Sequence, residues 1–309
     1  MKIIFAGTPG LAAKVLSALI AAGFEIPLVI TRPDALIGRK GILTPSAVAV
    51  EASKHNLPIL KTEQFSPNVI EEIRKSKANV GVVVAFGVFL PKLALSIIEH
   101  GWFNLHFSLL PKYRGAAPAQ HALLNGDRVT GVTIFQIDQG MDTGPIALQI
   151  PTEVAAHETA ARLLDRLTEL GITGLKEVLP QIAAGTIALT AQTSETASQA
   201  PKLHRGDAKI DWTAMASDIE NAVCAFNPEP YAYSNIDGLD IKILQARAIV
   251  GAPDLHSQPA QLHFNESRVL VTCGAGTALE LIEVQPAGKK AMAAIDWFRG
   301  LRSETMRFD

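Results

Sequence analysis

The first half of the chain alternates short apolar runs with amphipathic segments, and this pattern constrains the fold more than any other feature. The runs 2–7, 24–31, 79–86 and 101–109 are rich in Val, Ile and Phe and are typical of strands, whereas 11–23 and 46–56 are typical of helices. Nearly continuous apolar strands separated by helices predict a parallel sheet covered on both faces. The sequence therefore predicts an α/β fold with a Rossmann-like, doubly wound and mostly parallel sheet.

The second half of the chain changes character after a long helical stretch, 157–185, in which Gly171 and Gly185 are the expected helix ends. The next segment, TIALTAQTSETASQAP (186–201), is rich in Thr, Ser, Ala and Gln and is typical of a linker. Short β-like runs between turns follow and predict a small barrel or sandwich. We expect a first domain over 1–188, a linker over 189–204 and a smaller second domain over 205–309.

Composition excludes several classes of protein. A chain of 309 residues, 48% hydrophobic and 19% charged, suits two compact domains. Its net charge of −2 gives no global signal for nucleic acid, so a polyanionic partner would need a local basic patch. Two cysteines without a CxxC motif favour a reducing cytoplasm over a disulfide framework. The most apolar stretch, 80–90, is too short to span a bilayer.

One histidine stands out in FNLHFSLLPKYRGAAP (103–118). Side chains alternate along a strand, so Asn104 and His106 share one face while Phe103 and Leu105 point toward the core. The turn after Pro111 indicates that the pair lies near the carboxyl end of its strand, where open α/β sheets bind ligands. A catalytic pair and a hydrogen-bonded structural pair both fit this pattern.

Two aspartates follow the next apolar run in FQIDQGMDTGPI (135–146). Asp142 sits between Gly140 and Gly144, where the backbone can turn sharply and carry a carboxylate over a neighbouring strand end. Together, a neutral amide can donate a hydrogen bond, a histidine can titrate near neutral pH, and a carboxylate can orient or charge the histidine. An aspartate that only closes its own turn would look the same in the sequence.

The chemistry of such a set is limited by what the sequence lacks. There is no serine or cysteine in an obvious nucleophile elbow, and no HExxH or Cys/His cluster predicts a metal site. An Asn–His pair could stabilise an oxyanion, and a carboxylate could help to remove a proton from an attacking amine. We therefore expect acyl transfer to a nucleophile that belongs to the substrate. Deamination and amide hydrolysis stay open at this point.

The motif NLHFSLLP-x-x-RGAAP resembles that of the 10-formyltetrahydrofolate-dependent formyltransferases. Further segments fall where that family has its matching ones: FAGTP (5–9), VVVAFGVFLP (82–91), TGVTIFQIDQGMDTGPI (130–146), AKIDW (208–212), CAFNP (224–228) and QPAGKKAM (285–292). The last three resemble the second domain of the tRNA-directed members, so the resemblance covers essentially the whole chain. It implies an OB-like β-barrel for that domain.

The resemblance implies roles residue by residue. Asn104, His106 and Asp142 match the catalytic trio, in which the first two stabilise an oxyanion and the carboxylate assists proton transfer. The residues that match the folate-binding segments are Phe86, Gly87, Val88, Phe89, Leu90, Ser108, Leu109, Leu110 and Pro111. The implied formyl donor is 10-formyltetrahydrofolate, with no metal, and the implied acceptor is the amino group of methionyl initiator tRNA.

The loop 32–45 matches a segment that reaches the tRNA acceptor end. Arg39 and Lys40 are its candidate tRNA-binding residues, in a region, 31–61, that holds five Lys and Arg against two Asp and Glu. A solvated loop would also explain these charges. The nearest alternative within the family is an amino-sugar nucleotide formyltransferase. A non-catalytic RNA-binding protein would not need the Asn, His and Asp set. A dinucleotide oxidoreductase fits poorly, because GTPG is not GxGxxG.

Overall fold

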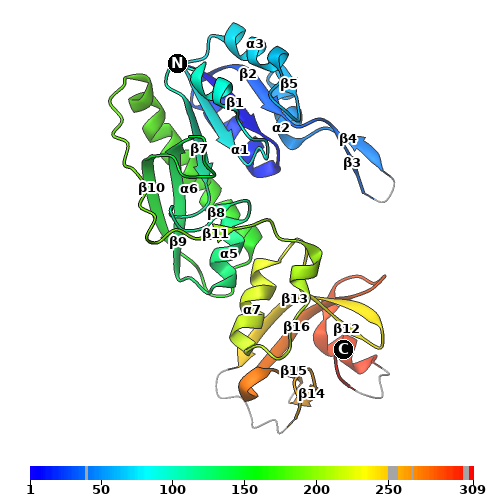
Figure 1. Cartoon of the computed structure of the whole chain (residues 1–309). Helices are drawn as coiled ribbons and strands as arrows, with labels where there is room; N and C mark the ends of the chain where they lie inside the picture. Colours follow the sequence, from blue (N-terminus) through cyan, green and yellow to red (C-terminus); the bar gives the residue numbers. More distant parts are fainter. Residues whose placement is uncertain (39–40, 250–256, 266, 302–305) are drawn as a thin grey trace. The chain divides into compact units, whose positions relative to one another are not determined.

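The computed structural model describes the chain except for residues 39–40, 250–256, 266 and 302–305 (Figure 1). The described chain divides into two compact units, each assembled from several stretches. The first unit comprises Met1–Pro118, Val129–Glu153 and Leu164–Pro201, and the second comprises Ala119–Arg128, Val154–Leu163 and Lys202–Asp309.

The first unit contains a seven-stranded sheet in the order β10-β9-β7-β6-β1-β2-β5. Its strands are β1 (Lys2–Gly7), β2 (Glu25–Thr31), β5 (Ile59–Lys61), β6 (Val80–Val84), β7 (Trp102–His106), β9 (Val129–Gln136) and β10 (Ile146–Glu153). The five strands from β7 to β5 are parallel, whereas β9 is antiparallel to both of its neighbours. This arrangement confirms the mostly parallel α/β sheet that the sequence predicts.

Helices cover both faces of this sheet. The helices of the unit are α1 (Gly10–Ala21), α2 (Ala47–Lys54), α3 (Pro67–Ser76), α4 (Lys92–Ser96) and α6 (Ala160–Ala183), the last of which begins in the second unit. Successive residues of β1, Ile3 to Ala6, are all fully buried, which requires cover on both sides. On one side, Val69, Ile70 and Ile73 of α3 join the core around Trp102.

Helix α6 runs without interruption through Gly171, so the expected helix end at this residue is wrong. A Cβ atom on Gly171 would lie 2.4 Å from the Leu105 side chain, and one on Gly174 would lie 3.0 Å from that of Ile134. These glycines permit close packing of the helix on β7 and β9. Gly185, with φ of 67°, does follow the end of the helix as expected.

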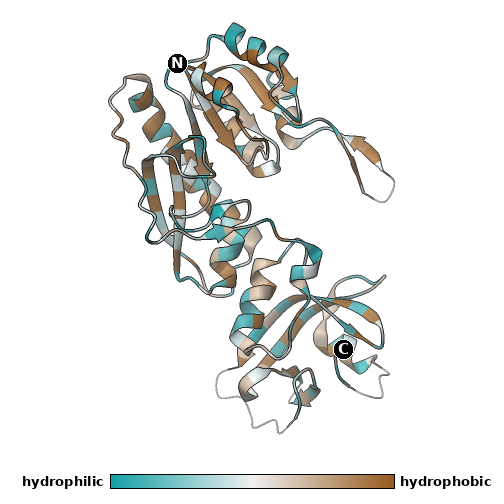
Figure 2. Ribbon diagram, viewed as in Figure 1, coloured by the Kyte–Doolittle hydropathy of each residue, from teal (hydrophilic) through white to brown (hydrophobic). Residues whose placement is uncertain are grey.

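The loop expected over 32–45 contains a short antiparallel hairpin of β3 (Ala35–Ile37) and β4 (Ile42–Thr44). Its large aliphatic side chains are exposed: Leu36, Ile37, Ile42 and Leu43. The two hairpin strands are brown in the hydropathy colouring of Figure 2, although they have no core to face. Four exposed aliphatic side chains in so short a segment are unusual for a solvated loop.

The second unit is built on a curled antiparallel sheet that forms a half-barrel in the order β12-β13-β16-β15-β14. Its strands are β12 (Tyr233–Ile236), β13 (Leu239–Ile249), β14 (Leu262–Asn265), β15 (Arg268–Thr272), β16 (Ala278–Pro286) and β17 (Met292–Ala293), which pairs with β16. Its helical segments are α5 (Pro118–Leu124), η1 (Arg205–Ala208), α7 (Ala216–Ala225), η2 (Gly274–Gly276) and α8 (Ala294–Arg299). This is the second, smaller β domain that the sequence predicts.

The second unit has its own core. Trp212 stacks on Phe308 with ring centroids 4.9 Å apart, and Trp297 stacks on the same ring at 6.0 Å. The indole nitrogen of Trp212 donates a hydrogen bond to Ser234 Oγ at 2.9 Å, which satisfies its polar group inside this core. Among the helices formed by described residues, none combines the length and apolar character needed to cross a bilayer.

Candidate active site

Strand β7 brings Asn104 and His106 to one edge of the sheet, as the alternation of the sequence predicts. Parallel pairing aligns β7 with β6, with Asn104 opposite Val83, so the strands end at the same edge. Phe103 and Leu105 occupy one buried face of the strand, and Asn104 and His106 share the other face with the fully buried Trp102. His106 is the last residue of β7.

Asp142 reaches His106 by a route that the sequence does not show. Strand β9 is antiparallel to β7, so its last residue, Gln136, pairs with Phe103 near the beginning of β7. The following loop therefore starts at the far end of β7 and folds back along it. The two ends of the loop approach each other closely at Gly144. A side chain there would not fit, because its Cβ atom would lie 1.8 Å from the Gln136 carbonyl oxygen. The Asp142 carboxylate lies at the carboxyl end of β7, with Oδ2 3.7 Å from His106 Nδ1.

The two aspartates of this loop have different partners. Asp138 Oδ1 accepts hydrogen bonds from Gly140 N at 2.9 Å and Thr143 Oγ1 at 2.7 Å, so this carboxylate closes its own turn. Asp142 instead accepts a hydrogen bond from Gly115 N at 2.8 Å and faces His106. Asp138 thus closes its own turn, whereas Asp142 lies next to His106.

The imidazole of His106 has one ring nitrogen engaged and one facing the carboxylate. His106 is 4% exposed, and its Nε2 lies 2.9 Å from the Tyr113 carbonyl oxygen. A carbonyl oxygen only accepts, so Nε2 carries a proton and donates it. Burial lowers the pKa of His106, because the charged ring loses water, while Asp142 and the Tyr113 carbonyl act in the opposite direction. The free protein therefore holds a neutral ring with Nδ1 available.

We expect nuclear magnetic resonance titration of the His106 ring to give a pKa below 6.5 and an Nε2–H tautomer. In Asp142→Asn the pKa should fall further, because the substitution removes the carboxylate that favours the charged ring.

The unfolded chain binds this proton at about pH 6.5 and the folded chain only at lower pH. The contribution of His106 to stability is therefore lost as the pH falls below about 6.5. A pKa above 6.5 would contradict the assignment.

The side chain of Asn104 differs from those of His106 and Asp142 in its hydrogen bonding. Its side chain is half-buried, and within the described residues the carboxamide makes no hydrogen bond. A carboxamide offers two N–H donors and an acceptor oxygen, and leaving these unpaired in a buried site is costly. Partial exposure lets water satisfy Asn104 until a substrate does. Asn104 and His106 lie two residues apart on one face of β7, so the site presents an amide and an imidazole on the same side of the strand.

The loop after β7 is held by a second segment of the chain. Strand β8 (Arg114–Gly115) pairs in parallel with β11 (Gln199–Ala200), and Tyr113 N donates to Ser198 Oγ at 2.9 Å. Tyr113 has φ of 63°, in the left-handed region, which presents its carbonyl oxygen to His106. The loop that fixes the tautomer of His106 is therefore itself fixed by residues 198–200.

The SLLP segment is supported by a threonine in β9. Thr133 is fully buried, donates to the Ser108 carbonyl oxygen at 2.6 Å and accepts from Leu110 N at 3.0 Å. Gln149 of β10 donates to the Leu110 carbonyl oxygen at 2.8 Å. Sequence reasoning missed both residues, because a polar residue in a strand pattern looks the same whether it faces solvent or holds a loop.

The residues matched to folate binding divide by exposure. Phe86, Leu90, Ser108 and Leu110 are buried, Val88, Leu109 and Pro111 are half-buried, and Gly87 and Phe89 are exposed. The Ser108 hydroxyl is already used, because it donates to the Lys112 carbonyl oxygen at 2.6 Å. The accessible surface is thus mainly backbone and apolar side chain, which suits a flat heterocycle.

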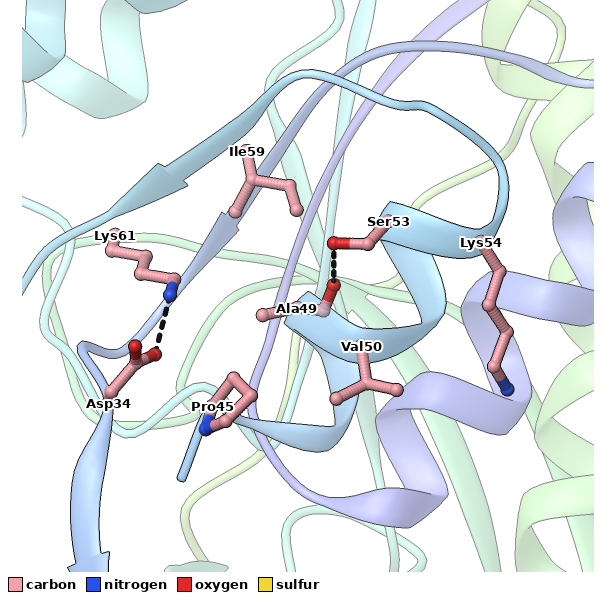
Figure 3. A pocket seen from close by; sticks show the side chains of 8 residues that line it. All are labelled: Asp34, Pro45, Ala49, Val50, Ser53, Lys54, Ile59 and Lys61. Carbon is pink, nitrogen blue, oxygen red and sulfur yellow. Dashed lines mark hydrogen bonds and ion pairs between the residues drawn. The ribbon is translucent and has the colours of Figure 1, made fainter. Parts of the chain in front are cut away.

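The two candidate tRNA-binding residues, Arg39 and Lys40, lie outside the described residues. A cavity of about 530 Å³ lies at the base of the β3–β4 hairpin, where Asp34 precedes β3 and Pro45 follows β4 (Figure 3). One wall is closed by an ion pair between Lys61 Nζ and Asp34 at 2.5 Å. This cavity contains none of the matched catalytic or folate-binding residues.

The described residues offer no reactive cysteine and no metal site. Burial raises the pKa of the Cys224 thiol to about 11 and that of Cys273 to about 12, so both stay protonated and unreactive. No group of three or more His, Cys, Asp and Glu side chains in the described part of the chain could hold a metal ion. The arrangement can donate hydrogen bonds, move a proton and bind a flat ligand.

Comparisons with known proteins agree with this chemistry. The family model described as formyl transferase matches residues 1–179, and the model of the formyl transferase C-terminal domain matches residues 202–302. The chain therefore belongs to the formyl transferase family and is an enzyme that transfers formyl groups.

Curated relatives place it more narrowly within the family. The methionyl-tRNA formyltransferase of Renibacterium salmoninarum is 42% identical over 301 residues, which are 97% of each chain. The methionyl-tRNA formyltransferase of Leifsonia xyli is 42% identical over 99% of each chain. These likenesses run through both domains.

Solved structures share the fold at lower identity. An N-formyltransferase from Helicobacter canadensis, solved with folinic acid and dTDP-3-aminofucose, is 20% identical with a TM-score of 0.65, and the match covers 93% of this chain and 99% of the other. HypX from Aquifex aeolicus is 14% identical with a TM-score of 0.66, and the match covers 98% of this chain and 49% of HypX.

Proposed function

We propose that the protein transfers the formyl group of 10-formyltetrahydrofolate to the free amino group of methionyl initiator tRNA. The observation that carries the chemistry is the site at the end of β7, where Asn104 and His106 share one face of the strand and the Asp142 carboxylate lies 3.7 Å from His106 Nδ1. The acceptor follows from identities of 40–42% to methionyl-tRNA formyltransferases over both domains.

The roles of the side chains follow from their partners. The new C–N bond forms between the amine and the formyl carbon, and the C–N10 bond then breaks, so one proton must leave the amine and one must reach N10. Nδ1 of neutral His106 can accept the first proton, and Asp142 at 3.7 Å stabilises the resulting imidazolium. The same proton then passes from Nδ1 to N10 as the C–N10 bond breaks, which returns the ring to its neutral form. The Asn104 amide, joined by protonated Nδ1, donates to the oxygen that becomes negative during attack.

Proposed binding of the donor uses the strip from Phe86 to Leu90 and the SLLP segment. Exposed backbone at Gly87 supplies hydrogen-bonding groups, and the half-buried side chains of Val88 and Leu109 supply apolar walls. Both segments follow strands of the same edge, β6 and β7, so they border the catalytic side chains.

The alternative is formyl transfer to an amino-sugar nucleotide. Sugar N-formyltransferases with the same fold are only 15–21% identical to this chain, half or less of the identity of the tRNA-directed relatives. Purified protein with 10-formyltetrahydrofolate should formylate methionyl initiator tRNA, measured by acid-gel mobility, and should leave a dTDP-amino sugar unchanged. Active, folded protein that formylates the sugar and not the tRNA would reject the proposal.

We expect the double substitution Arg39→Ala with Lys40→Ala to weaken tRNA binding. Each cation that binds a phosphate releases a counterion, which makes tRNA binding weaker as the salt concentration rises. In the variant, the slope of log kcat/KM for tRNA against log salt concentration should therefore be shallower, by about 1 for each phosphate contact that is lost. The KM for the folate donor should not change. Arg74→Ala with Lys75→Ala, an exposed arginine and lysine that pair with Glu71 and Glu72 on α3, is the matched control. An unchanged salt slope would contradict the role of the loop.

The same proposal includes a monomeric enzyme in the cytoplasm and a second domain, 205–309, that contacts the tRNA. Basic and aromatic side chains meet on that domain, where Lys242 lies over the Tyr231 ring at 4.5 Å and Arg205 over the Tyr233 ring at 4.8 Å. Such pairs are suited to nucleic acid, because cations bind phosphates and rings stack on bases.

A further inference from the structure

The segment expected as a linker, 189–204, begins by packing onto the sheet of the first unit. Thr190 and Ile146 exchange two backbone hydrogen bonds, at 2.7 and 2.8 Å, beyond the Asp142 loop. Further on, Ser198 and Ala200 accept hydrogen bonds from Arg114 N and Ala116 N, both at 2.8 Å. The segment is therefore anchored on both sides of the candidate site.

Gln192 lies between these two anchors and joins the loops on either side. Its Nε2 donates to the carbonyl oxygens of Asp142 at 2.9 Å and Gly144 at 2.8 Å. Its Oε1 accepts from Arg114, from Nη2 at 2.7 Å and Nε at 3.2 Å. A guanidinium only donates and a carbonyl only accepts, so the amide can be oriented in one way alone.

Asp142 needs such support because its backbone is unfavourable by itself. Its φ of 55° lies in the left-handed region, which costs a non-glycine residue free energy unless neighbouring contacts hold it. The hydrogen bonds of Asp138 close the turn before Asp142, and Gly115 N holds the carboxylate. Gln192 is the side chain that binds the backbone carbonyl of Asp142 itself.

The chemistry of the amide is essential to this contact. Arg114 requires an acceptor and the two carbonyls require a donor, and a glutamine supplies both within one planar group. A glutamate would keep the acceptor for Arg114 and would turn a second oxygen toward two carbonyl oxygens. That substitution therefore breaks the contact to the Asp142 loop while changing the size of the side chain very little.

We propose that Gln192 is a positioning residue that holds the Asp142 carboxylate in place against His106 during formyl transfer. Gln192 touches neither substrate in this assignment and acts through Asp142. The inference rests on the proposed function, because it assigns Asp142 a part in the reaction.

Gln192→Glu tests the inference in the full-length protein. We expect kcat for formylation of methionyl-tRNA to fall by roughly 10- to 100-fold, because a shift of about 1 Å in a reacting group has an effect of this size. The KM values for 10-formyltetrahydrofolate and for tRNA should stay within about twofold of wild type, because Gln192 touches neither substrate. Gln181→Glu is the matched control, because Gln181 is an exposed glutamine of the same unit that donates to the Glu177 carbonyl oxygen of its own helix.

A double-substitution cycle separates positioning from general damage. If Gln192 acts through Asp142, then Gln192→Glu should lower kcat by less than about twofold when Asp142→Asn is already present. Equal fold losses in both backgrounds, or an unchanged kcat in Gln192→Glu, would overturn the inference. If Gln192→Glu does not fold by circular dichroism, Gln192→Ala enters the same cycle. Wild-type protein that does not formylate tRNA would count against the proposed function, not against Gln192.

Discussion

His106→Ala is expected to lower kcat for formyl transfer by roughly 10²- to 10⁴-fold, which is the range of a lost general acid–base group. Nδ1 is the ring nitrogen that faces Asp142, and the described part of the site holds no second histidine beside it. Loss of the ring also removes the donor to the Tyr113 carbonyl oxygen, so stability should fall by about 1–3 kcal/mol. Single-turnover kinetics and urea unfolding measure the two effects.

His106→Gln separates the two contributions. A glutamine amide can still donate to the Tyr113 carbonyl oxygen, so most of the stability should return, but it cannot accept a proton from the amine. The control is His55→Gln, at an exposed histidine of the same unit whose imidazole contacts Glu51. Restored turnover in His106→Gln would show that the ring serves structure rather than proton transfer.

Gly115→Ala is expected to have the second large effect, on both stability and turnover. Gly115 has φ of 131°, and a Cβ atom there would lie 2.5 Å from the Ala200 carbonyl oxygen. Backbone strain and overpacking should together cost roughly 2–4 kcal/mol of unfolding free energy. Because Gly115 N also binds the Asp142 carboxylate at 2.8 Å, a shift of this loop should lower kcat as well.

The measurements for Gly115→Ala are urea unfolding and kcat at saturating substrates. Gly206→Ala is the matched control, since a Cβ atom there meets nothing within 4 Å and its φ lies outside the strained range. The control should lie within about 0.5 kcal/mol of wild type. Wild-type stability in Gly115→Ala would mean that β8 and β11 can separate without cost.

The fold class follows from patterns that are local in the sequence. Four of the five strands of the parallel sheet, β1, β2, β6 and β7, lie in the apolar runs that the sequence marks, because each run is local. Strand β5 (Ile59–Lys61) is only three residues long, and the sequence did not predict it. The predicted helix end at Gly171 was wrong because the role of this glycine depends on a distant contact. A glycine inside a helix and a glycine at its end look alike, and only the Leu105 side chain packed against Gly171 distinguishes them.

The candidate site follows from the sequence in part. Strand alternation pairs Asn104 with His106, because a period of two is fixed by backbone geometry. Whether Asp138 or Asp142 faces the histidine is not local, because it depends on how the loop folds back along β7. Gln192 and Ser198 carried no local signal at all, since a segment rich in Thr, Ser and Gln resembles a linker until its partners are known.

The α/β sheet, the second β domain, the pair on β7 and the likeness to formyltransferases can all be predicted from residues that are close in the sequence. Three other features depend on the folded chain: the antiparallel β9 directs its loop back to His106, Tyr113 fixes the proton on Nε2, and Gln192 binds the Asp142 loop. These features cannot be predicted locally because their partners are far apart along the chain. The hydrogen bonds of Gln192 and Ser198 join residues 50 and 85 positions apart, and no local pattern encodes such contacts.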